Sequence, residues 1–443
     1  MKSESRRKSI WEDLHLLETL RGGGVFFVIK ILASLGAYGL AWYVSREYGA
    51  EGNGVLAFAL TAATLLAALF NLGLNTYIVK MIQVLKASGE WTGIDRFYRR
   101  ALVTIVGATL IGCGVLMLIS MVISDDTLSR DMYLVSWATI PISIMLFISH
   151  VYKGHQRILG FSLLQNNVVQ VLALFILVVP IWGKSSVSEP VWAVILAGSF
   201  LCIAGWHQYQ SSKDNSSVQE FRFRPHIRQA LPMLAGGLAF MILNLTDRMM
   251  LRFMDTTTQL GIYDVSLRLS NLALLGILSL NTVAEPKFAH FYARNENQQL
   301  KQFAARMTWI GIGISLPVLC ILGLFPSTWL GMFGTGDEFL SGIPSLYLLL
   351  VGQVISVGCG AVLILLNMTG HQRDVQMILL ICAMLNIGLN FILIPSMSID
   401  GAALATMIST LVWNLWGLWV IRKKLGFWMW GGGYRKMIRD SWR

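Results

Sequence analysis

Long apolar stretches alternate with short polar connections along almost the whole chain. An apolar run of about 20 residues is long enough to cross the hydrocarbon core of a bilayer as a helix. Because that core contains no water, each backbone N–H and C=O group must be paired within the segment, which favours helices over open strands. The pattern predicts membrane-spanning helices at residues 24–46, 53–79, 101–124, 132–152, 161–182, 191–210, 230–253, 261–284, 306–325, 342–367, 375–395 and 401–421.

The polar stretches divide these twelve predicted spans into two groups of six. The longest, residues 211–229, lies at the midpoint and is interpreted as a cytoplasmic linker. It separates an N-terminal six-helix bundle, residues 24–210, from a C-terminal six-helix bundle, residues 230–421. Residues 1–23 have the spacing of an amphipathic helix that lies on the inner leaflet, and residues 422–443 form a basic and aromatic cytoplasmic tail.

An internal repeat relates the two groups. Gly154-His-Gln-Arg recurs as Gly370-His-Gln-Arg, and Gly54-Val-Leu-Ala has a weaker match in Gly261-Ile-Tyr, 207 residues later. Equivalent positions are six spans apart, which is an even number, so the two halves have the same orientation. The repeat predicts an all-α polytopic membrane protein whose two bundles are related by a pseudo-twofold axis along the membrane normal.

Composition agrees with a membrane protein. The chain is 55% hydrophobic and 13% charged, whereas soluble domains carry about 25% charged residues. With the N-terminus in the cytoplasm, most of the 35 Lys and Arg residues fall on the cytoplasmic side, as expected for inner-membrane proteins. The outer side receives only Arg46, Arg130, Lys184 and Arg252. The sequence therefore predicts both termini in the cytoplasm, and the net charge of +11 reflects topology better than a nucleic-acid surface.

Neither an enzyme nor a metal site is predicted. The five Cys residues lie within apolar segments and form no CxxC pair, so neither a disulfide nor a metal centre is expected. The chain contains no P-loop, HExxH or GxSxG motif. The loops are too short for a soluble catalytic domain. We therefore expect no catalytic residues and no cofactor.

Charged residues inside predicted spans are the strongest candidates for function, because such charges are costly and usually mark transport pathways. Asp247 and Arg248 lie near the outer end of the seventh span, and Asp264 and Arg268 lie four apart near the start of the eighth. A short loop joins these spans, so the four groups can meet. One interpretation is an ion-pair network that pins the hairpin. The other is a cationic wall for phosphate oxygens, with Asp247 or Asp264 as a site for a coupling ion. Lys30, in the first span, either faces the same path or extends to the inner headgroups.

Polar neutral residues form a second group of candidates. Asn71 and Asn75 share a face of the second span, and Asn386 and Asn390 are four apart in the eleventh. Hydrogen bonds between helices are the common role of such residues. The alternative role is contact with sugar hydroxyls, which we expect for a minority of them.

Eight short motifs, in this order, resemble the polysaccharide (O-antigen type) flippases of the multidrug/oligosaccharidyl-lipid/polysaccharide (MOP) exporter superfamily. They are Tyr48-Gly-Ala-Glu-Gly-Asn-Gly-Val-Leu-Ala-Phe-Ala, Asn71-Leu-Gly-Leu-Asn-Thr, Leu231-Pro-Met-Leu, Asp247-Arg-Met-Met, Gly261-Ile-Tyr-Asp-Val-Ser, Ala284-Glu-Pro-Lys-Phe, Gly370-His-Gln-Arg and Asp400-Gly-Ala-Ala-Leu-Ala-Thr. The resemblance covers nearly the whole chain, and the order and spacing of the motifs carry it.

The resemblance implies two six-helix bundles around a central cavity that opens alternately to each side of the bacterial inner membrane. It implies a substrate of sugars on a polyprenyl diphosphate, moved to the outer leaflet for lipopolysaccharide or other surface polysaccharide. The expected partners are this lipid-linked oligosaccharide, membrane lipids, and the glycosyltransferases and glycan polymerase of the pathway. We expect a monomer that binds no nucleic acid. The family has no strict catalytic signature, so the candidate residues rest on the charge argument.

Two other functions compete with a flippase. A drug or cation antiporter of the same superfamily should have a binding carboxylate unpaired with Arg and an acidic cavity, whereas the charges within the spans here are three basic and two acidic. A membrane glycan polymerase or ligase should have a sizeable outer loop with catalytic Arg or His. The outer loops here are short and acidic, which favours the flippase.

Overall fold

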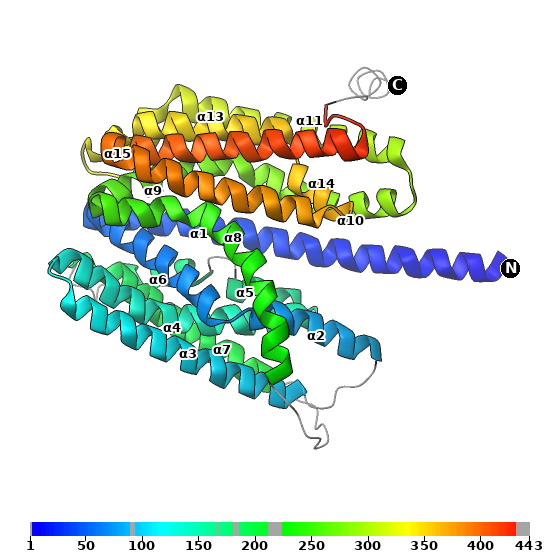
Figure 1. Ribbon diagram of the computed structural model, residues 1–443, viewed down its shortest axis with the longest axis horizontal. Coiled ribbons are helices and arrows are strands. Elements are labelled where there is room, and N and C mark those ends of the chain that lie inside the picture. Colours follow the sequence, from blue (N-terminus) through cyan, green and yellow to red (C-terminus); the bar gives the residue numbers. More distant parts are fainter. Residues whose placement is uncertain (1, 89–93, 166–167, 180–185, 211–223, 431–443) are drawn as a thin grey trace. The chain divides into compact units, whose positions relative to one another are not determined.

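The regular secondary structure of the described residues is helical, and no strand occurs among them. The computed structural model describes residues 2–88, 94–165, 168–179, 186–210 and 224–430. Figure 1 shows the helices, whose bounds are α1 Lys2–Phe70, α2 Leu74–Ser88, α3 Ile94–Val122, α4 Asp126–Gly154, α5 Ile158–Gln165, α6 Val168–Val178, α7 Glu189–Gln210, α8 Arg224–Met254, α9 Thr257–Asn271, η1 Leu272–Leu274, α10 Leu275–Ala293, α11 Asn297–Leu324, α12 Pro326–Gly331, η2 Glu338–Gly342, α13 Ile343–Cys359, α14 Val362–Met368 and α15 Gln372–Leu425.

Within the described ranges, eight helical stretches are long and apolar enough to cross a membrane. Two of the helices contain a sharp kink and so hold two spans each. Gly49 (φ 69°) divides α1, and Ser398 (φ 53°) divides α15. The helices correspond to the twelve predicted spans once these two are divided and consecutive short helices are taken together. The first six spans are the first part of α1, its second part with α2, α3, α4, α5 with α6, and α7. The last six are α8, α9 with η1 and α10, α11, α13 with α14, and the two parts of α15.

The outer surface of single helices shows why these segments belong in lipid. On α3, Val103, Ile111 and Leu118 are 71%, 72% and 65% exposed. Seven or eight residues separate them, so they lie on one face of the helix. Such a continuous apolar face would be costly in water, and a bilayer removes that cost. The chain is therefore an all-α, multi-pass membrane protein.

The chain forms two compact units. Unit 1 comprises residues 1–40, 66–182 and 192–234, and unit 2 comprises residues 41–65, 183–191 and 235–443. The boundaries of these units therefore do not coincide with the predicted linker between the two halves of the chain. The part of α1 around Gly49 packs within unit 2, and the first residues of α8 pack within unit 1. The linker itself, residues 211–223, lies outside the described ranges, and α8 begins directly after it.

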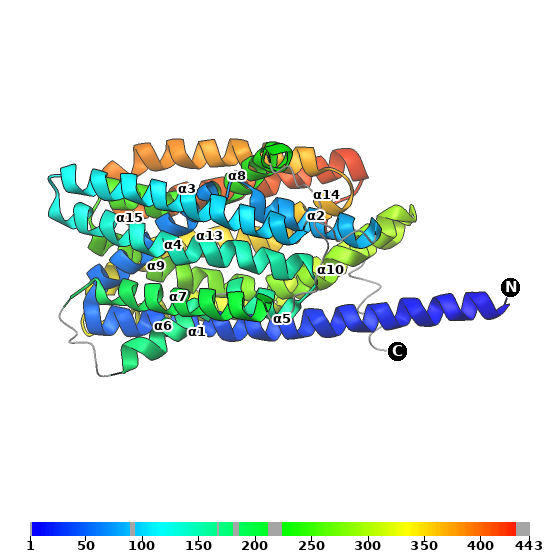
Figure 2. The same ribbon diagram turned by 90° about the horizontal axis from the view of Figure 1, so that it is seen from below.

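Each unit has its own apolar core. In unit 1, α2 and α3 pack against α4 around residues such as Ile78, Phe97 and Phe147. In unit 2, α10, α11, α13 and α14 pack with α15 around residues such as Phe288, Leu365 and Ile378. Figure 2 shows α3 and α4 of unit 1 running side by side. Both cores consist of side chains from several helices, so each unit is a helix bundle.

Several predicted spans are interrupted rather than continuous. The second breaks between α1 and α2, where Leu72 (φ 52°) and Gly73 (φ 74°) have left-handed backbone angles. The eighth passes through the 3₁₀ turn η1, and the tenth breaks at Gly360 (φ 75°). Apolar length does not reveal such breaks, because the residues around them remain hydrophobic. Broken helices within a membrane require polar groups nearby to pair the freed backbone groups.

The two predicted terminal segments are continuous with their neighbouring helices. α1 runs without a break from Lys2 through the first predicted span. At the other end, α15 continues to Leu425, and Gly426 (φ 80°) ends it in the left-handed conformation that glycine adopts without strain. Residues 431–443 of the predicted tail lie outside the described ranges.

Candidate functional site

The candidate site lies on the hairpin of α8 and α9 in unit 2. Asp255 and Thr256 form the connection, and the Thr256 hydroxyl accepts a hydrogen bond from the Gln259 N–H, which caps α9. This two-residue connection brings the last turns of α8 beside the first turns of α9. Residues 247 and 248 of α8 therefore lie opposite residues 263 and 264 of α9, as the sequence predicts.

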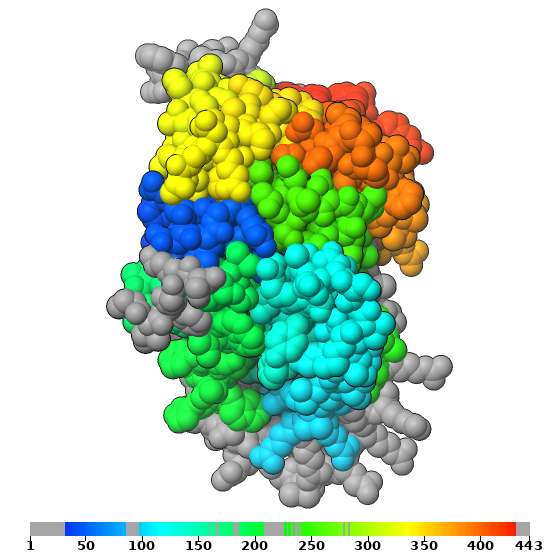
Figure 3. All heavy atoms as spheres, turned by 90° about the vertical axis from the view of Figure 1, so that its left-hand side faces the viewer, coloured from blue at the N-terminus to red at the C-terminus, as the bar shows by residue number. Residues whose placement is uncertain are grey.

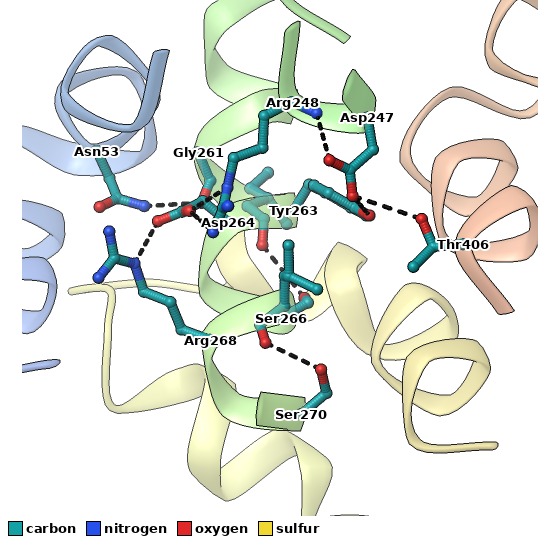
Figure 4. Close-up of polar contacts among 12 residues, drawn as sticks. Asn53, Asp247, Arg248, Gly261, Tyr263, Asp264, Ser266, Arg268, Ser270 and Thr406 are labelled. Carbon is teal, nitrogen blue, oxygen red and sulfur yellow. Dashed lines mark hydrogen bonds and ion pairs between the residues drawn. The ribbon is translucent and has the colours of Figure 1, made fainter. Parts of the chain in front are cut away.

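Asp264 is the centre of the site. Its Oδ1 accepts hydrogen bonds from Arg248, with Nε at 2.8 Å and Nη2 at 2.7 Å. Its Oδ2 accepts a hydrogen bond from Nε of Arg268 at 2.5 Å, one helical turn further along α9. Figure 4 shows the carboxylate between the two guanidinium groups, which reach it from different sides. Two arginines therefore share one carboxylate.

Asp247 has different partners. The Tyr263 hydroxyl donates to its Oδ2 at 2.6 Å, and the Arg248 backbone N–H donates to its Oδ1 at 2.8 Å. Thr406, on the second part of α15, donates a longer hydrogen bond of 3.4 Å to Oδ2. Asp247 is therefore held by neutral donors and connects α8 to both α9 and α15, beside the arginine pair (Figure 4).

Asp264 is more deeply buried than the two arginines that bind it. The Asp264 side chain is 1% exposed, whereas the side chains of Arg248 and Arg268 are each 15% exposed. Removing a carboxylate from water is costly unless charged donors satisfy it, and here both of its oxygens are satisfied by Arg. The partly exposed Arg248 and Arg268 side chains carry two positive charges, which Asp264 and the neighbouring Asp247 balance when all four groups are charged. The site can thus offer charge-assisted hydrogen bonds to an anion.

The remaining charged candidate is not placed by the structure. Lys30 lies within α1, but its side chain falls outside the described part of the chain. Whether it joins the arginines or extends to the inner headgroups stays a prediction.

Asn71 and Asn75 differ although they share the second predicted span. Asn71 is fully buried at the break between α1 and α2. Its Nδ2 donates to the Ala67 carbonyl at 2.7 Å and to the backbone oxygen and hydroxyl of Ser143 at 3.2 and 3.1 Å. Asn75 is only partly buried, one turn along in α2. The bonds of Asn71 are therefore those of a helix–helix contact in unit 1.

Asn386 and Asn390 bond to each other. Nδ2 of Asn390 donates to Oδ1 of Asn386 at 2.9 Å, and both residues are buried in α15. The other oxygen, Oδ1 of Asn390, is buried and has no hydrogen-bond partner within the described residues. Their contact with sugar stays a prediction.

Three contributors to the site were not predicted from the sequence. Tyr263 and Thr406 hold Asp247, and Asn53 donates its Nδ2 to the Gly261 carbonyl at 2.9 Å. Tyr263 lies sixteen residues after Asp247, the same separation as Arg248 and Asp264, so the hairpin register could have revealed it. Thr406 lies 159 residues from Asp247, and no local pattern connects them.

Within the described residues, no group of three or more His, Cys, Asp or Glu side chains is arranged to hold a metal ion. All five cysteines are free.

Solved structures with the same fold are membrane transporters. The chain is 16% identical to an inward-facing multidrug resistance MATE family transporter of the MOP superfamily, with a TM-score of 0.66 over 90% of this chain and 98% of that one. It is 14% identical to the lipid II flippase MurJ in an inward closed conformation, with a TM-score of 0.69 over 90% and 87%. It is 15% identical to a MOP superfamily transporter from Pyrococcus furiosus, with a TM-score of 0.59 over 92% and 95%. These similarities establish the fold.

Comparison with family models identifies the family. No curated protein sequence matches the chain. The MatE model matches residues 232–392. The model described as polysaccharide biosynthesis protein matches residues 19–292, which is more than half of the chain. This chain therefore belongs to the polysaccharide biosynthesis protein family.

Proposed function

We propose that this protein moves a polyprenyl-diphosphate-linked oligosaccharide from the cytoplasmic to the outer leaflet of the bacterial inner membrane, for the synthesis of O-antigen or another surface polysaccharide. The observation that carries the proposal is the pair of partly exposed arginines on one buried carboxylate. A diphosphate has several oxygens that accept hydrogen bonds, and Arg presents a planar fork that matches them. The same pair would repel a cationic drug.

The proposed mechanism assigns the head group and the lipid to different environments. The diphosphate cannot cross hydrocarbon unaided, because an unpaired charge there is very costly. Arg248 and Arg268 replace the lost water with charge-assisted hydrogen bonds. The prenyl tail stays in the lipid, since it has no polar group to shelter. Binding on one side and release on the other then follow from alternating access.

Asp264 has a positioning role in this proposal. It holds both guanidinium groups through Nε and so fixes their orientation on the hairpin. A fixed guanidinium loses less conformational entropy on binding than a free one. Asp247 is held by Tyr263, Thr406 and the Arg248 backbone N–H, and it is the candidate for a coupling ion or proton. An inside-negative membrane potential also favours outward movement of an anionic head group, by about 2.3 kcal/mol per charge per 100 mV.

A second candidate function is a cation-coupled antiporter for drugs or other small molecules. The specific observation in its favour is the MatE match over residues 232–392, the part of the chain that contains the arginine pair. In that case Asp247, bound by Tyr263 and Thr406, would carry the coupling ion. The two arginines on Asp264 argue against a cationic substrate.

The test is a comparison of the two substrate classes in reconstituted vesicles. Purified protein in proteoliposomes should move a fluorescent polyprenyl-diphosphate oligosaccharide between leaflets faster than protein-free vesicles do. It should not accumulate a cationic dye under a proton or sodium gradient. Dye transport without movement of the lipid-linked glycan would contradict the proposal and support the antiporter. A polyprenyl monophosphate with the same glycan is a useful second probe, because it offers fewer oxygens to the arginines.

A further inference from the structure

Two helices of unit 2, α1 and α9, approach each other closely at a pair of glycines. A Cβ atom built on Gly54 of α1 would lie 1.9 Å from the carbonyl oxygen of Thr257 in α9, and one built on Gly261 would lie 1.9 Å from the carbonyl oxygen of Ala50. Both obstacles are backbone atoms, which cannot move aside as a side chain can. In Figure 3 the blue surface around the kink of α1 adjoins the green surface at the start of α9. Only glycine permits this approach at either position.

The contact is reciprocal within the internal repeat. Gly54 and Gly261 are 207 residues apart, and so are their contact partners Ala50 and Thr257. Each half of the chain thus presents the same glycine to the same partner position of the other half. A contact of this kind surrounds a twofold axis, as in symmetric dimers. Such reciprocity is the pattern expected of two repeats related by a pseudo-twofold axis.

Hydrogen bonds hold the segment around the crossing in place. Asn53, which is fully buried, donates its Nδ2 to the Gly261 carbonyl at 2.9 Å. The Ala50 N–H donates to Oε2 of Glu338 at 3.3 Å, and the Tyr48 hydroxyl donates to Oε2 of Glu189 at 2.7 Å. These bonds attach the segment 41–65, whose two ends continue into unit 1. The segment is thus fastened to one unit and covalently continuous with the other.

The arginine site lies just inside the crossing. Arg268 follows Gly261 by seven residues, and Thr61 follows Gly54 by seven. Seven residues are about two helical turns, so each lies on the same face as its glycine and about 10 Å further into the membrane. Figure 4 shows the Arg268 side chain extending from α9 toward the part of α1 that carries Asn53. In the predicted orientation, the crossing separates the arginine site from the outer solution.

We propose that the crossing of Gly54 and Gly261 is the outer gate of the transport pathway, closed in this structure and opened when segment 41–65 separates from α9. The inference rests on the proposed function only in requiring that a pathway open outward. The closed contact depends on the close approach of two backbones, so one added methyl group at either glycine is enough to prevent it. The hydrogen bonds of Asn53 to α9 and of Ala50 to Glu338 of η2 then set the balance between the closed and open states.

The test measures access to a cysteine placed inside the gate. Thr61→Cys is a small change at a residue that is 6% exposed, and it should react little with a membrane-impermeant maleimide added outside spheroplasts. The labelling of the protein that has only its five native cysteines is measured as background and subtracted. Gly54→Ala or Gly261→Ala should raise labelling of Thr61→Cys by about tenfold or more, because the new Cβ excludes the closed contact. Gly388→Ala is the matched control, because a Cβ there meets nothing within 4 Å.

Combining both glycine substitutions should add little to either one, because both separate the same contact. Asn53→Ala introduces no clash and should raise labelling less, by about fivefold for the loss of one buried hydrogen bond. If accumulated Gly54→Ala and Gly261→Ala proteins label no more than the Gly388→Ala control, the crossing is fixed packing and the inference is overturned. If neither glycine variant accumulates in the membrane, the Asn53→Ala variant provides the test. Labelling of Thr61→Cys that is unchanged by Asn53→Ala would then overturn the proposed gate.

The labelling requires no substrate, so its outcome is independent of the proposed function. A protein that opens on Gly54→Ala but fails to move a lipid-linked glycan would retain the gate and lose the flippase assignment. If the protein moves the glycan but Gly54→Ala does not change the labelling, the flippase assignment is retained and the gate is lost.

Discussion

At the scale of single residues, the sharing of Asp264 by two arginines decides how each substitution should behave. Replacing one arginine leaves the buried carboxylate paired with the other. Replacing the carboxylate leaves two guanidinium groups without their common partner. The arrangement thus lets binding be tested separately from folding, because Arg248 and Arg268 can each be removed without creating an unpaired buried charge.

Asp264→Asn should reduce stability strongly. Removing one partner of a buried ion pair typically costs about 3–5 kcal/mol, and here two arginines lose it. We expect lower membrane abundance and a lower unfolding temperature in detergent than for Arg248→Ala, measured by fluorescence-detected size-exclusion chromatography after heating. Equal stability of Asp264→Asn and Arg248→Ala would show that the carboxylate is not the structural centre of the site.

The two asparagines of the second span should separate a structural role from a binding role. Asn71→Ala removes the hydrogen bonds to Ala67 and Ser143 and should cost about 1–2 kcal/mol of stability. Asn75→Ala changes a partly buried side chain and should leave the unfolding temperature unchanged. If Asn75 contacts sugar, its variant should lower glycan transport per molecule. Unchanged transport by Asn75→Ala would remove it from the candidates.

At the scale of helices, apolar length predicted the segments because the bilayer imposes it directly. The i, i+4 spacing of Asp264 and Arg268 and the short hairpin also predicted their meeting, since helix geometry fixes which residues share a face. The breaks at Gly73 and Gly360 were not predicted, because a glycine inside an apolar run is compatible with a continuous helix. The contact of Thr406 with Asp247 was not predicted either, since it depends on how α15 packs against α8.

The break in the second span gives an element-level prediction. A Cβ on Gly73 would lie 2.3 Å from the Ala230 carbonyl oxygen, and the backbone there has φ of 74°. Gly73→Ala therefore combines a clash with a left-handed conformation that costs a non-glycine residue about 1–3 kcal/mol. We expect a lower unfolding temperature than for Gly107→Ala in α3, where a Cβ meets nothing within 4 Å. Equal unfolding temperatures would mean that the break does not need glycine.

At the scale of the whole molecule, the charge distribution and the even number of spans predict both termini in the cytoplasm. An epitope tag at Met1 or Arg443 should resist protease added outside spheroplasts and become accessible after permeabilisation. A tag between Asp125 and Asp126, at the predicted outer start of α4, should behave in the opposite way. Protection of the α4 tag, or cleavage of either terminal tag from outside, would show that the predicted orientation is wrong.

The central claim is that the arginine pair binds the diphosphate head group, and its most direct test is transport by the single-arginine variants. Arg248→Ala and Arg268→Ala in proteoliposomes should each move the lipid-linked oligosaccharide about tenfold more slowly or worse, the effect of losing one charge-assisted contact of about 1.5–3 kcal/mol. Arg→Lys should restore part of the rate, since Lys keeps the charge and loses the bidentate fork. Arg130→Ala, which breaks an Arg–Asp pair in unit 1, should transport normally.

These rates must be compared at equal amounts of folded protein. The account predicts normal abundance with lost transport for both alanine variants. Disappearance of both variants from the membrane would make the network purely structural. Full activity of both abundant variants would contradict head-group binding by the arginine pair.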